Sequence, residues 1–478
     1  SNPRGYYVYK YYLNTATAMS LDQKAWYLED RWQIADNFLL SIGVRNDQFT
    51  NANNVGAKYL DAKNQWAPRL GFAWDVNGDG SLKLFGNAGR YFLAMPNNVA
   101  IRGASASTFT RDYYTYTGID ANGAPTGLTP IPRVDGGTGP YSANGEYGQP
   151  VDVLSFAPKD LKNMYQDEYL IGMEKMLTPK WMLGMKLTRR SLKSAMDDIC
   201  DPGRMEAKLE SIQAGLSSKV VVPGCFMFNP GGTNTFSLAN VTGGGRTEVV
   251  MTAADWGFTD SMKRNYSGLD LYLEHLFDGK WELRVDYTLS KSSGNMGGQV
   301  KSEFGQDNIS KTQDWDAAEI MAYANGYLAN DRRHQLKVRG SYQITDELSV
   351  GANFRINSGS PFSCLGYFNP DNRDENGGSA DPIGYGASYH TCFGQVATPG
   401  SKRNPWTRTL DLGLSYAPNF LDKKLKLGMQ VLNVFNANGV LQAGVTSETN
   451  PYTVSNTFML PQGRQTPRTV VFTASYDW

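Results

Sequence analysis

Nucleophilic catalysis and phosphate binding each need a defined set of residues, and the chain offers neither set. Its three histidines, His275, His334 and His390, lie in distant segments, so a Ser–His–Asp arrangement would have to bridge separate parts of the fold. The glycine run 243–245 follows no strand–helix pattern and does not predict a phosphate loop. We therefore expect no enzyme activity, no catalytic residue and no cofactor.

The segment 75–80, DVNGDG, begins as a calcium-binding EF-hand loop does. The twelfth position of such a loop would be Gly86, where a bidentate glutamate is needed. Asn-Gly and Asp-Gly are also the preferred residues of a tight hairpin. We favour the hairpin turn and expect no metal site.

The four cysteines are Cys200, Cys225, Cys364 and Cys392. Each consecutive pair falls inside one long irregular segment, which favours disulfides that close loops lacking a core of their own. Zinc binding and free thiols are the alternatives; His390 near Cys392 is the one hint of zinc, which would need closely spaced ligand pairs. Four cysteines allow three pairings, and proximity within the loops favours Cys200 with Cys225 and Cys364 with Cys392.

A run of aromatic and charged residues, FTRDYYTYT, occupies 109–117. Aromatic faces beside polar groups suit sugars, peptides or aromatic chelators, whereas the alternative is that these side chains pack the loop onto itself. The candidate ligand contacts are Phe109, Arg111, Asp112, Tyr113, Tyr114 and Tyr116.

In the segments that must position these residues, apolar and polar side chains alternate with a period of two residues. In 281–290 the apolar Trp281, Leu283 and Val285 alternate with polar side chains, so a strand there has one apolar and one polar face. The segments 269–274, 336–344, 348–356, 410–416 and 425–431 repeat this pattern. The polar face predicts lumen-facing residues in a barrel: Arg284, Asp286, Lys337, Arg339 and Arg355.

The connections alternate between very short turns and long irregular loops. The turns are at 35–36, 77–80, 178–179, 278–279, 345–346 and 421–423, and the loops are near 92–162, 196–262, 293–330, 359–405 and 437–467. A soluble sandwich also alternates, but strands of about 10 residues with aromatics at their ends favour a transmembrane barrel. Examples of such aromatics are Trp26, Trp32, Trp66, Trp74, Trp181, Tyr342 and Trp406.

We therefore predict an all-β fold, a transmembrane antiparallel up-and-down β-barrel with short periplasmic turns and long extracellular loops. The expected strands are 14 in number, at 4–14, 22–34, 37–50, 64–75, 81–92, 163–177, 180–195, 263–277, 280–292, 331–344, 347–358, 406–418, 424–436 and 468–478.

The composition agrees with a barrel and excludes other classes. Apolar residues are 41% and mean hydropathy is −0.44, and no stretch approaches the ~18 consecutive apolar residues of a membrane-spanning helix. Lysine plus arginine equals aspartate plus glutamate at 46 each, which gives no indication of a nucleic-acid partner.

The final strand ends the chain on an aromatic residue. Its apolar face is Val470, Phe472, Ala474, Tyr476 and Trp478. This looks like the C-terminal signal by which outer-membrane proteins engage the barrel assembly machinery; the alternative is an ordinary amphipathic strand.

Several segments together resemble one family. LKLGMQVLNVFNAN (425–438) and GRQTPRTVVFTASYDW (463–478) are similar to the last two strands of TonB-dependent outer-membrane receptors and transporters. The segments 67–92, 266–294 and 331–362 are closer to the Oar-like branch of that family.

The resemblance implies a location in the outer membrane of a Gram-negative bacterium, in contact with its lipid. It also implies uptake through a plugged barrel of about 22 strands, driven by TonB–ExbB–ExbD through a plug domain. Residues 1–478 would be the C-terminal barrel portion without the plug, part of a longer gene product or, as the alternative, a genuinely small barrel. The substrate would be a small molecule, a glycan or, in the Oar-like branch, a peptide or protein. The alternative functions are a structural or adhesive surface protein and a passive porin-like channel.

Overall fold

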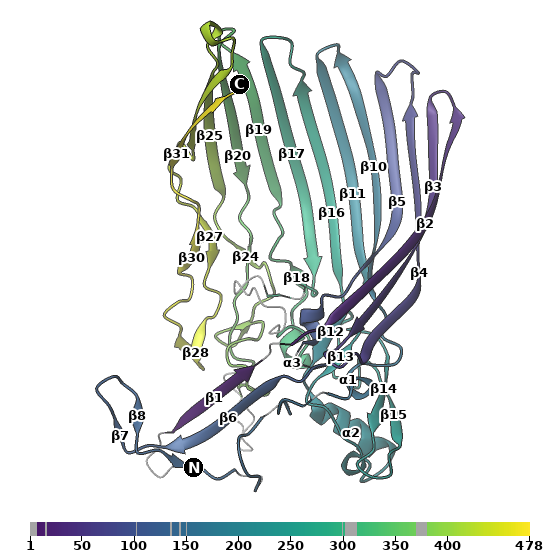
Figure 1. Ribbon diagram of the computed structural model, residues 1–478, viewed down its shortest axis with the longest axis vertical. Coiled ribbons are helices and arrows are strands. Elements are labelled where there is room, and N and C mark those ends of the chain that lie inside the picture. The colour runs from purple at the N-terminus through teal and green to yellow at the C-terminus, as the bar shows by residue number, and fades with distance from the viewer. Residues whose placement is uncertain are drawn as a thin grey trace.

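One large antiparallel sheet of 14 strands dominates the structure (Figure 1). The computed structural model describes residues 7–478 apart from 15–16, 102, 134–135, 143–144, 150, 299, 302–312 and 370–379. Thirteen strands follow one another in chain order: β2 (Ser20–Ala35), β3 (Phe38–Ala52), β4 (Lys58–Asp75), β5 (Leu82–Leu93), β10 (Met164–Thr178), β11 (Trp181–Ser194), β16 (Arg264–His275), β17 (Trp281–Gly294), β19 (His334–Gln343), β20 (Leu348–Asn357), β25 (Thr407–Tyr416), β26 (Leu425–Leu432) and β31 (Thr469–Tyr476). The fourteenth, β18 (Gly326–Tyr327), pairs with β17 beside this path.

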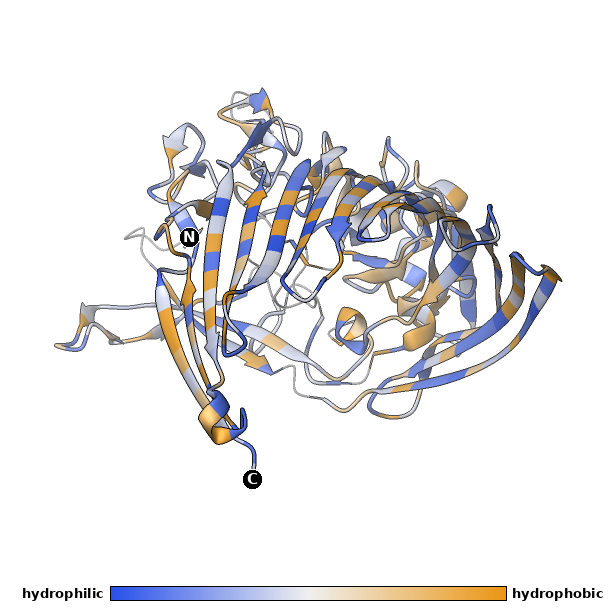
Figure 2. Cartoon of the chain, turned by 90° about the horizontal axis from the view of Figure 1, so that it is seen from above, coloured by the Kyte–Doolittle hydropathy of each residue, from blue (hydrophilic) through white to orange (hydrophobic). Residues whose placement is uncertain are grey.

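The large sheet is curved but does not close. Seen from above, the strands form an arc, and hydrophilic and hydrophobic residues alternate along them (Figure 2). Within the described residues β2 and β31 each have one neighbour in this sheet. The all-β antiparallel architecture predicted from the sequence is confirmed, although the sheet is open and not a closed barrel. We call this sheet the wall.

One predicted wall strand is placed elsewhere. Residues 4–14 were expected to begin the barrel, but β1 (Val8–Asn14) pairs with β6 (Thr108–Thr115) in a separate sheet of three strands; residues 4–6 lie outside the described part of the chain. The aromatic face of β1 packs on β6 instead of joining the wall: between ring centroids, Tyr9 lies 5.8 Å from Tyr113 and Tyr11 lies 5.0 Å from Phe109. Of the 14 predicted wall strands, the other 13 correspond to the path from β2 to β31, and the sheet reaches 14 strands only with the two-residue β18 beside that path.

The register of the wall follows the alternation. In the β16–β17 pair Leu271 lies opposite Tyr287, whereas Glu274 lies opposite Arg284. Apolar side chains therefore share one face and charged side chains share the other across neighbouring strands. We call these the apolar face and the polar face of the wall.

The short turns lie together at one end of the wall, at the top of Figure 1. The expected hairpin at 75–80 is a turn between β4 and β5, in which the Asp75 carboxylate accepts backbone hydrogen bonds from Gly78 at 3.2 Å and Gly80 at 2.8 Å. Gly279, with φ +91°, supplies the left-handed backbone between β16 and β17. At this end His275 stacks on Trp281, with ring centroids 3.8 Å apart.

The opposite end carries the long connections, with one exception. The sequence predicted long loops throughout at this end, but β3 and β4 extend far enough that residues 53–57 alone join them. The five long connections run over 94–163, 195–263, 295–333, 358–406 and 433–468.

These connections contain short elements of their own. The helices are α1 (Val153–Phe156), α2 (Pro202–Ile212), α3 (Ala318–Met321) and the 3-10 turns η1 (Asn97–Ala100) and η2 (Ser217–Lys219), while η5 (Asn419–Leu421) lies in a turn at the other end. The small strands are β7 (Gly118–Ile119), β8 (Pro125–Thr126), β9 (Thr129–Pro130), β12 (Asp197–Ile199), β13 (Phe226–Phe228), β14 (Asn234–Ala239), β15 (Arg246–Met251), β21 (Pro361–Phe362), β22 (Thr391–Cys392), β23 (Gln395–Val396), β24 (Lys402–Arg403), β27 (Val440–Ala443), β28 (Glu448–Asn450), β29 (Thr453–Val454) and β30 (Pro461–Arg464). In the described part of the chain none of the helices has the length and apolar character needed to cross a membrane.

Candidate functional site

The residues predicted to face a lumen lie together on the polar face of β17, β19 and β20. Arg284 is directly opposite Arg339, and Lys337 is directly opposite both Asp286 and Arg355. Arg284 is held by Glu274 at 2.8 Å and by Asp286 at 2.9 Å. Among the described residues no carboxylate lies within ion-pair distance of Lys337, Arg339 or Arg355, and we call these three the cation patch.

The rest of the polar face is largely paired. Lys186 binds Asp270 at 3.3 Å, and Lys83 binds Glu174 at 3.3 Å. Like charges directly across strands destabilise a sheet, and the pair Lys337–Arg355 is such a case. The cation patch is thus a local excess of positive charge on a face that is otherwise balanced.

A depression of about 650 Å³ adjoins the cation patch. Arg339 and Arg355 line it together with Glu282, Asn353 and Asp411. Polar walls of this kind offer hydrogen bonds to a hydrated or carboxylate-bearing partner. The depression therefore offers both carboxylate and guanidinium groups to a segment lying against this face.

Three of the long connections share one buried core, which we call the loop cap. Phe226 and Trp256 come from 195–263, Trp315 from 295–333 and Tyr389 from 358–406, and all four are at most 1% exposed. The sequence-based expectation that the cysteine-bearing loops lack a core of their own is therefore wrong. The signal that could have indicated it is the set of phenylalanines and tryptophan in 226–258, since such side chains are usually buried.

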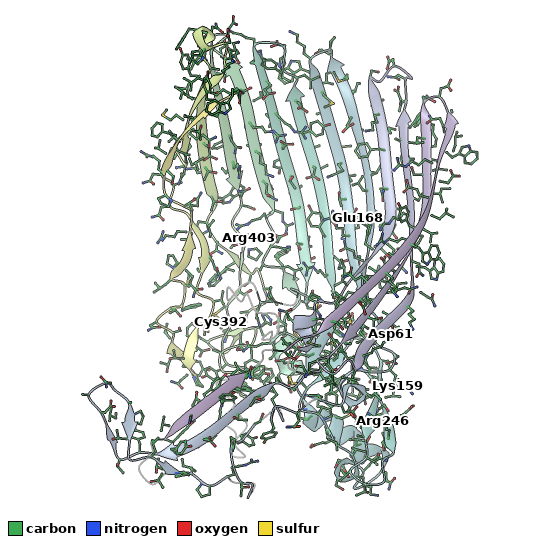
Figure 3. The ribbon with its side chains drawn as sticks, viewed as in Figure 1. Asp61, Lys159, Glu168, Arg246, Cys392 and Arg403 are labelled. Carbon is green, nitrogen blue, oxygen red and sulfur yellow. A yellow bond between two sulfur atoms is a disulfide. The ribbon has the colours of Figure 1, made fainter. Side chains whose placement is uncertain are left out.

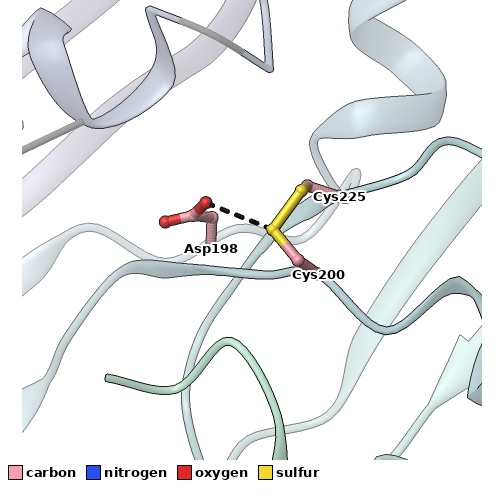
Figure 4. A group of neighbouring side chains, drawn as sticks. All are labelled: Asp198, Cys200 and Cys225. Atoms are coloured by element: carbon pink, nitrogen blue, oxygen red, sulfur yellow. Dashed lines mark hydrogen bonds between the residues drawn. A yellow bond between two sulfur atoms is a disulfide. The ribbon is translucent and has the colours of Figure 1, made fainter. Parts of the chain in front are cut away.

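The cysteines form two disulfides inside these connections. Cys200 is bonded to Cys225, and Cys364 is bonded to Cys392. The predicted disulfides are therefore present, and the alternatives of zinc binding and free thiols do not apply to these four cysteines. Asp198 lies beside the first bridge, where Cys200 Sγ is 3.8 Å from Asp198 Oδ2 (Figure 4). This trio has the spacing of metal ligands, but sulfurs bonded to each other are not the thiolates that a metal needs.

Two titratable side chains are sealed inside the loop cap. Asp197 is 0% exposed, its Oδ1 accepts from the Asp198 backbone N–H at 3.1 Å, and its Oδ2 has no hydrogen-bond partner in the described structure. Burial, then the neighbouring Asp198 and Asp316 carboxylates, raise the pKa of Asp197 well above its usual value. Burial and the Lys301 cation lower the pKa of His390 to about 3.

An ion cluster joins two of the long connections where they meet the wall. Asp331 is buried, accepts the Ser292 backbone N–H at 2.6 Å and binds the Arg403 guanidinium, with Arg333 3.6 Å away. Figure 3 labels Arg403 near the lower ends of β19 and β20. Its guanidinium also lies 5.2 Å from the centre of the Tyr327 ring. This cluster fixes 295–333 against 358–406.

Most of the candidate ligand run at 109–117 is not irregular loop, because 109–115 belong to the strand β6. Arg111 lies over the Tyr9 ring at 5.2 Å and the Phe109 ring at 5.4 Å, and Tyr113 is 5.8 Å from Tyr9. The pairing with β1 places Phe109, Arg111 and Tyr113 on one face and Asp112 and Tyr114 on the other. Tyr116 follows the strand, and no pattern in the sequence indicated that β1 would be the partner of β6.

The closing strand β31 is exposed along its whole length and pairs with β26 alone. Val470, Phe472, Ala474 and Tyr476 lie on one face as expected, and Trp478 follows the strand end, 5.7 Å from Tyr476 between ring centroids. Their role as an assembly signal stays a prediction.

Comparison with known proteins relates most of the chain to an outer-membrane transporter. The TonB-dependent transporter Oar of Myxococcus xanthus is 27% identical over 439 residues, which are 87% of this chain and 35% of the relative. The chain thus spans about a third of the length of that curated relative.

The solved structures that the chain matches are far less similar to it in sequence. The outer membrane transporter YddB from Escherichia coli is 13% identical, with a TM-score of 0.48 over 95% of this chain and 45% of that one. The FrpB iron transporter from Neisseria meningitidis is 11% identical, with a TM-score of 0.49 over 96% of this chain and 46% of that one.

A family description covers more than half of the chain. Residues 50–346 match the family described as outer membrane beta barrel domain. The match, together with the similarity to Oar, confirms the resemblance stated from the sequence and the location in the outer membrane of a Gram-negative bacterium. The chain belongs to the outer membrane β-barrel family.

Proposed function

We propose that the chain is the wall of an energy-coupled outer-membrane receptor that takes up its substrate through a plugged barrel. The observation that carries this proposal is the cation patch of Lys337, Arg339 and Arg355 on the polar face. An excess of positive charge on a lumen face is stabilised when an anionic segment lies against it. A plug domain carrying carboxylates, not included in residues 1–478, is the segment that we infer.

The loop cap is the proposed capture surface of this receptor. Its shared core and two disulfides hold the long connections in one arrangement, which lowers the ordering cost of binding. The aromatic face of Phe109, Arg111 and Tyr113 is the proposed contact for a peptide, glycan or chelate. The similarity to Oar supports energy coupling through TonB–ExbB–ExbD.

A surface adhesin is the second candidate. The packed loop cap favours it, because a rigid extracellular surface can bind macromolecules with no transport step. A passive channel is the third, and the open depression on the polar face favours it.

The test compares cells with and without the gene, in backgrounds with and without TonB. Labelled peptides, glycans, ferric chelates and cobalamin would be offered separately, and both uptake and surface binding would be measured. Uptake of one class that requires both the gene and TonB supports the receptor. Uptake independent of TonB indicates a channel, and surface binding without uptake indicates an adhesin.

A charge variant tests the inferred plug contact. Lys337, Arg339 and Arg355 would each be changed to Gln in the full-length protein, and antibiotic leakage would report plug seating. The matched control is Lys186→Gln with Asp270→Asn, which removes a balanced pair from the same face. We expect raised leakage from the first variant alone; equal leakage from both would contradict a role for the cation patch in holding the plug.

A further inference from the structure

One face of the β1–β6 ribbon carries a continuous line of aromatic rings. The register puts the odd-numbered residues of both strands on this face, where Tyr9 lies opposite Tyr113. Centroids of neighbouring rings along the line are 5.0 to 6.4 Å apart. We call these five rings the aromatic strip, which runs through Tyr7, Tyr113, Tyr9, Tyr11 and Phe109.

The aromatic strip is open to solvent. Tyr7, Tyr9 and Tyr11 are 58%, 45% and 48% exposed. The two strands that carry it lie on the side of the long connections, below the wall in Figure 1. A contiguous patch of exposed aromatic rings marks a binding surface. Because the rings form a line, they suit a chain-like ligand that touches several of them at once.

Arg111 is the single charged residue on this face of β1 and β6. It lies directly opposite Tyr11, and its guanidinium carbon is 5.8 Å from the centre of that ring. The charged neighbours Lys10 and Asp112 lie opposite each other on the other face of the ribbon. Among the described residues no carboxylate lies within ion-pair distance of Arg111. The aromatic strip therefore contains one cation whose charge the described chain leaves uncompensated.

The position of the rings on a face favours a glycan over a peptide. An extended peptide binds a sheet by pairing with the backbone of an edge strand. The backbone groups of β1 and β6 point along the plane of the ribbon, and the face of the aromatic strip offers side chains alone. Sugar rings have apolar C–H faces that pack on aromatic rings, and tyrosine hydroxyls bind the sugar hydroxyls around them. The guanidinium adds a planar, bidentate partner for a carboxylate.

We propose that the aromatic strip and Arg111 bind a linear acidic glycan. A carboxylate-bearing sugar lies at Arg111, and the neighbouring sugars lie on the rings to either side. This inference rests on the proposed function, because it names the substrate class that the capture surface delivers to the barrel. The guanidinium provides the preference for acidic sugars, whereas the rings contribute to the binding of charged and neutral sugars alike.

The test measures oligosaccharide binding to the purified full-length protein in detergent by isothermal titration calorimetry. The probes are linear tetramers of galacturonic, mannuronic and guluronic acid. Each acid tetramer is compared with the same tetramer after reduction of its carboxylates to alcohols. A hexaglutamate peptide is the acidic probe without sugar rings.

Two variants change the aromatic strip and two matched controls change the other face of β1. Arg111→Gln removes the cation, and Tyr11→Ala removes one ring. Lys10→Gln and Tyr12→Ala make the same kinds of change on the other face, where Tyr12 is 57% exposed. Each protein is first checked for heat-modifiable migration of the folded barrel.

We expect at least one acid tetramer to bind about tenfold more tightly than its reduced counterpart. Arg111→Gln should abolish this preference and leave the affinity for the reduced tetramer unchanged. Tyr11→Ala should weaken the binding of both tetramers severalfold, and neither control should alter either affinity. Equal affinity for acid and reduced tetramers, an unchanged preference in Arg111→Gln, or equal binding of hexaglutamate would overturn the proposal.

Uptake measurements on the same tetramers separate this inference from the proposed function. Binding of an acid tetramer that depends on Arg111, without uptake that depends on TonB, would support the glycan site and contradict the receptor. TonB-dependent uptake of another substrate class, by a protein that binds no acid tetramer, would overturn the glycan site and support the receptor.

Discussion

The buried carboxylate of Asp331 binds the guanidinium of Arg403, which lies 72 residues later in the chain and belongs to another long connection. Arg333 shares the same carboxylate at 3.6 Å. One anion therefore compensates two cations where both connections leave the wall.

Replacement of Asp331 by Asn should loosen this junction, because it leaves two partly buried cations without their counterion. We expect a local loss of about 3 kcal/mol, measured as faster hydrogen exchange in 326–333 and 402–404. Glu29→Gln, which removes an exposed pair with Arg31, should change nothing measurable. Unchanged exchange in the Asp331 variant would show that the cluster contributes no stability.

Removal of the Cys364–Cys392 disulfide should loosen its own connection more than the rest of the loop cap. The bridge spans 28 residues, for which loop entropy predicts a contribution of about 3–4 kcal/mol. The measurement is limited proteolysis of the Cys364→Ser/Cys392→Ser protein, with cleavage expected in 358–406. Cys200→Ser/Cys225→Ser serves as the comparison and should expose 195–263 to cleavage instead. Identical cleavage patterns in the two variants would contradict the idea that each disulfide stabilises its own connection.

Acid should open the loop cap through His390. The pKa of His390 is about 3 in the folded chain against a usual 6.5, so the unfolded segment takes up a proton first as the pH falls. The contribution of neutral His390 to the free energy of unfolding is therefore fully present above pH 6.5. It is lost progressively as the pH falls toward 3, by on the order of 4 kcal/mol. Hydrogen exchange of 389–396 between pH 7.5 and pH 4 measures this. The variant His390→Gln should flatten the pH dependence, and a dependence equal to that of the unaltered chain would exclude His390 as its source.

Asp197 should respond to pH in the opposite direction. Its raised pKa means that the folded chain favours the protonated carboxyl, so this stability is present below the usual value of 3.8 and is lost as the pH rises. Asp197→Asn keeps a neutral side chain of the same shape and should slow hydrogen exchange of 197–199 at pH 7.5. Faster exchange in this variant would indicate that the ionised form is needed.

If the assembly machinery binds the apolar face of β31, deletion of Trp478 should lower the amount of folded protein in the outer membrane severalfold. Phe472→Ala on the same face should have a smaller effect in the same direction. Ser475→Ala, on the other face of the strand, is the control. The measurement is heat-modifiable migration of the protein in membrane fractions. Equal amounts of folded protein in the three variants would show that β31 is an ordinary closing strand and not an assembly signal.

The wall was predictable because its chemistry is periodic. Leu283, Val285 and Tyr287 alternate with charged residues, and that pattern alone determines which face each side chain occupies. The same reasoning placed Arg284, Lys337 and Arg355 on one face before their register was known.

The loop cap was not predictable in this way. Phe258 and Trp315 meet across segments without any repeat, and their contact depends on chain paths that turns and disulfides determine. β1 was misplaced for a related reason, since pairing with β6 joins residues almost a hundred positions apart.

The shared core of the loop cap has a consequence for anything that recognises this surface. Residues of three connections are held by one set of aromatic contacts, so neighbouring surface points belong to distant parts of the chain. An antibody selected against the folded cap would read a discontinuous epitope and lose it on denaturation. A peptide copied from any single connection would not elicit that antibody, and a substitution at Trp256 would alter epitopes on all three.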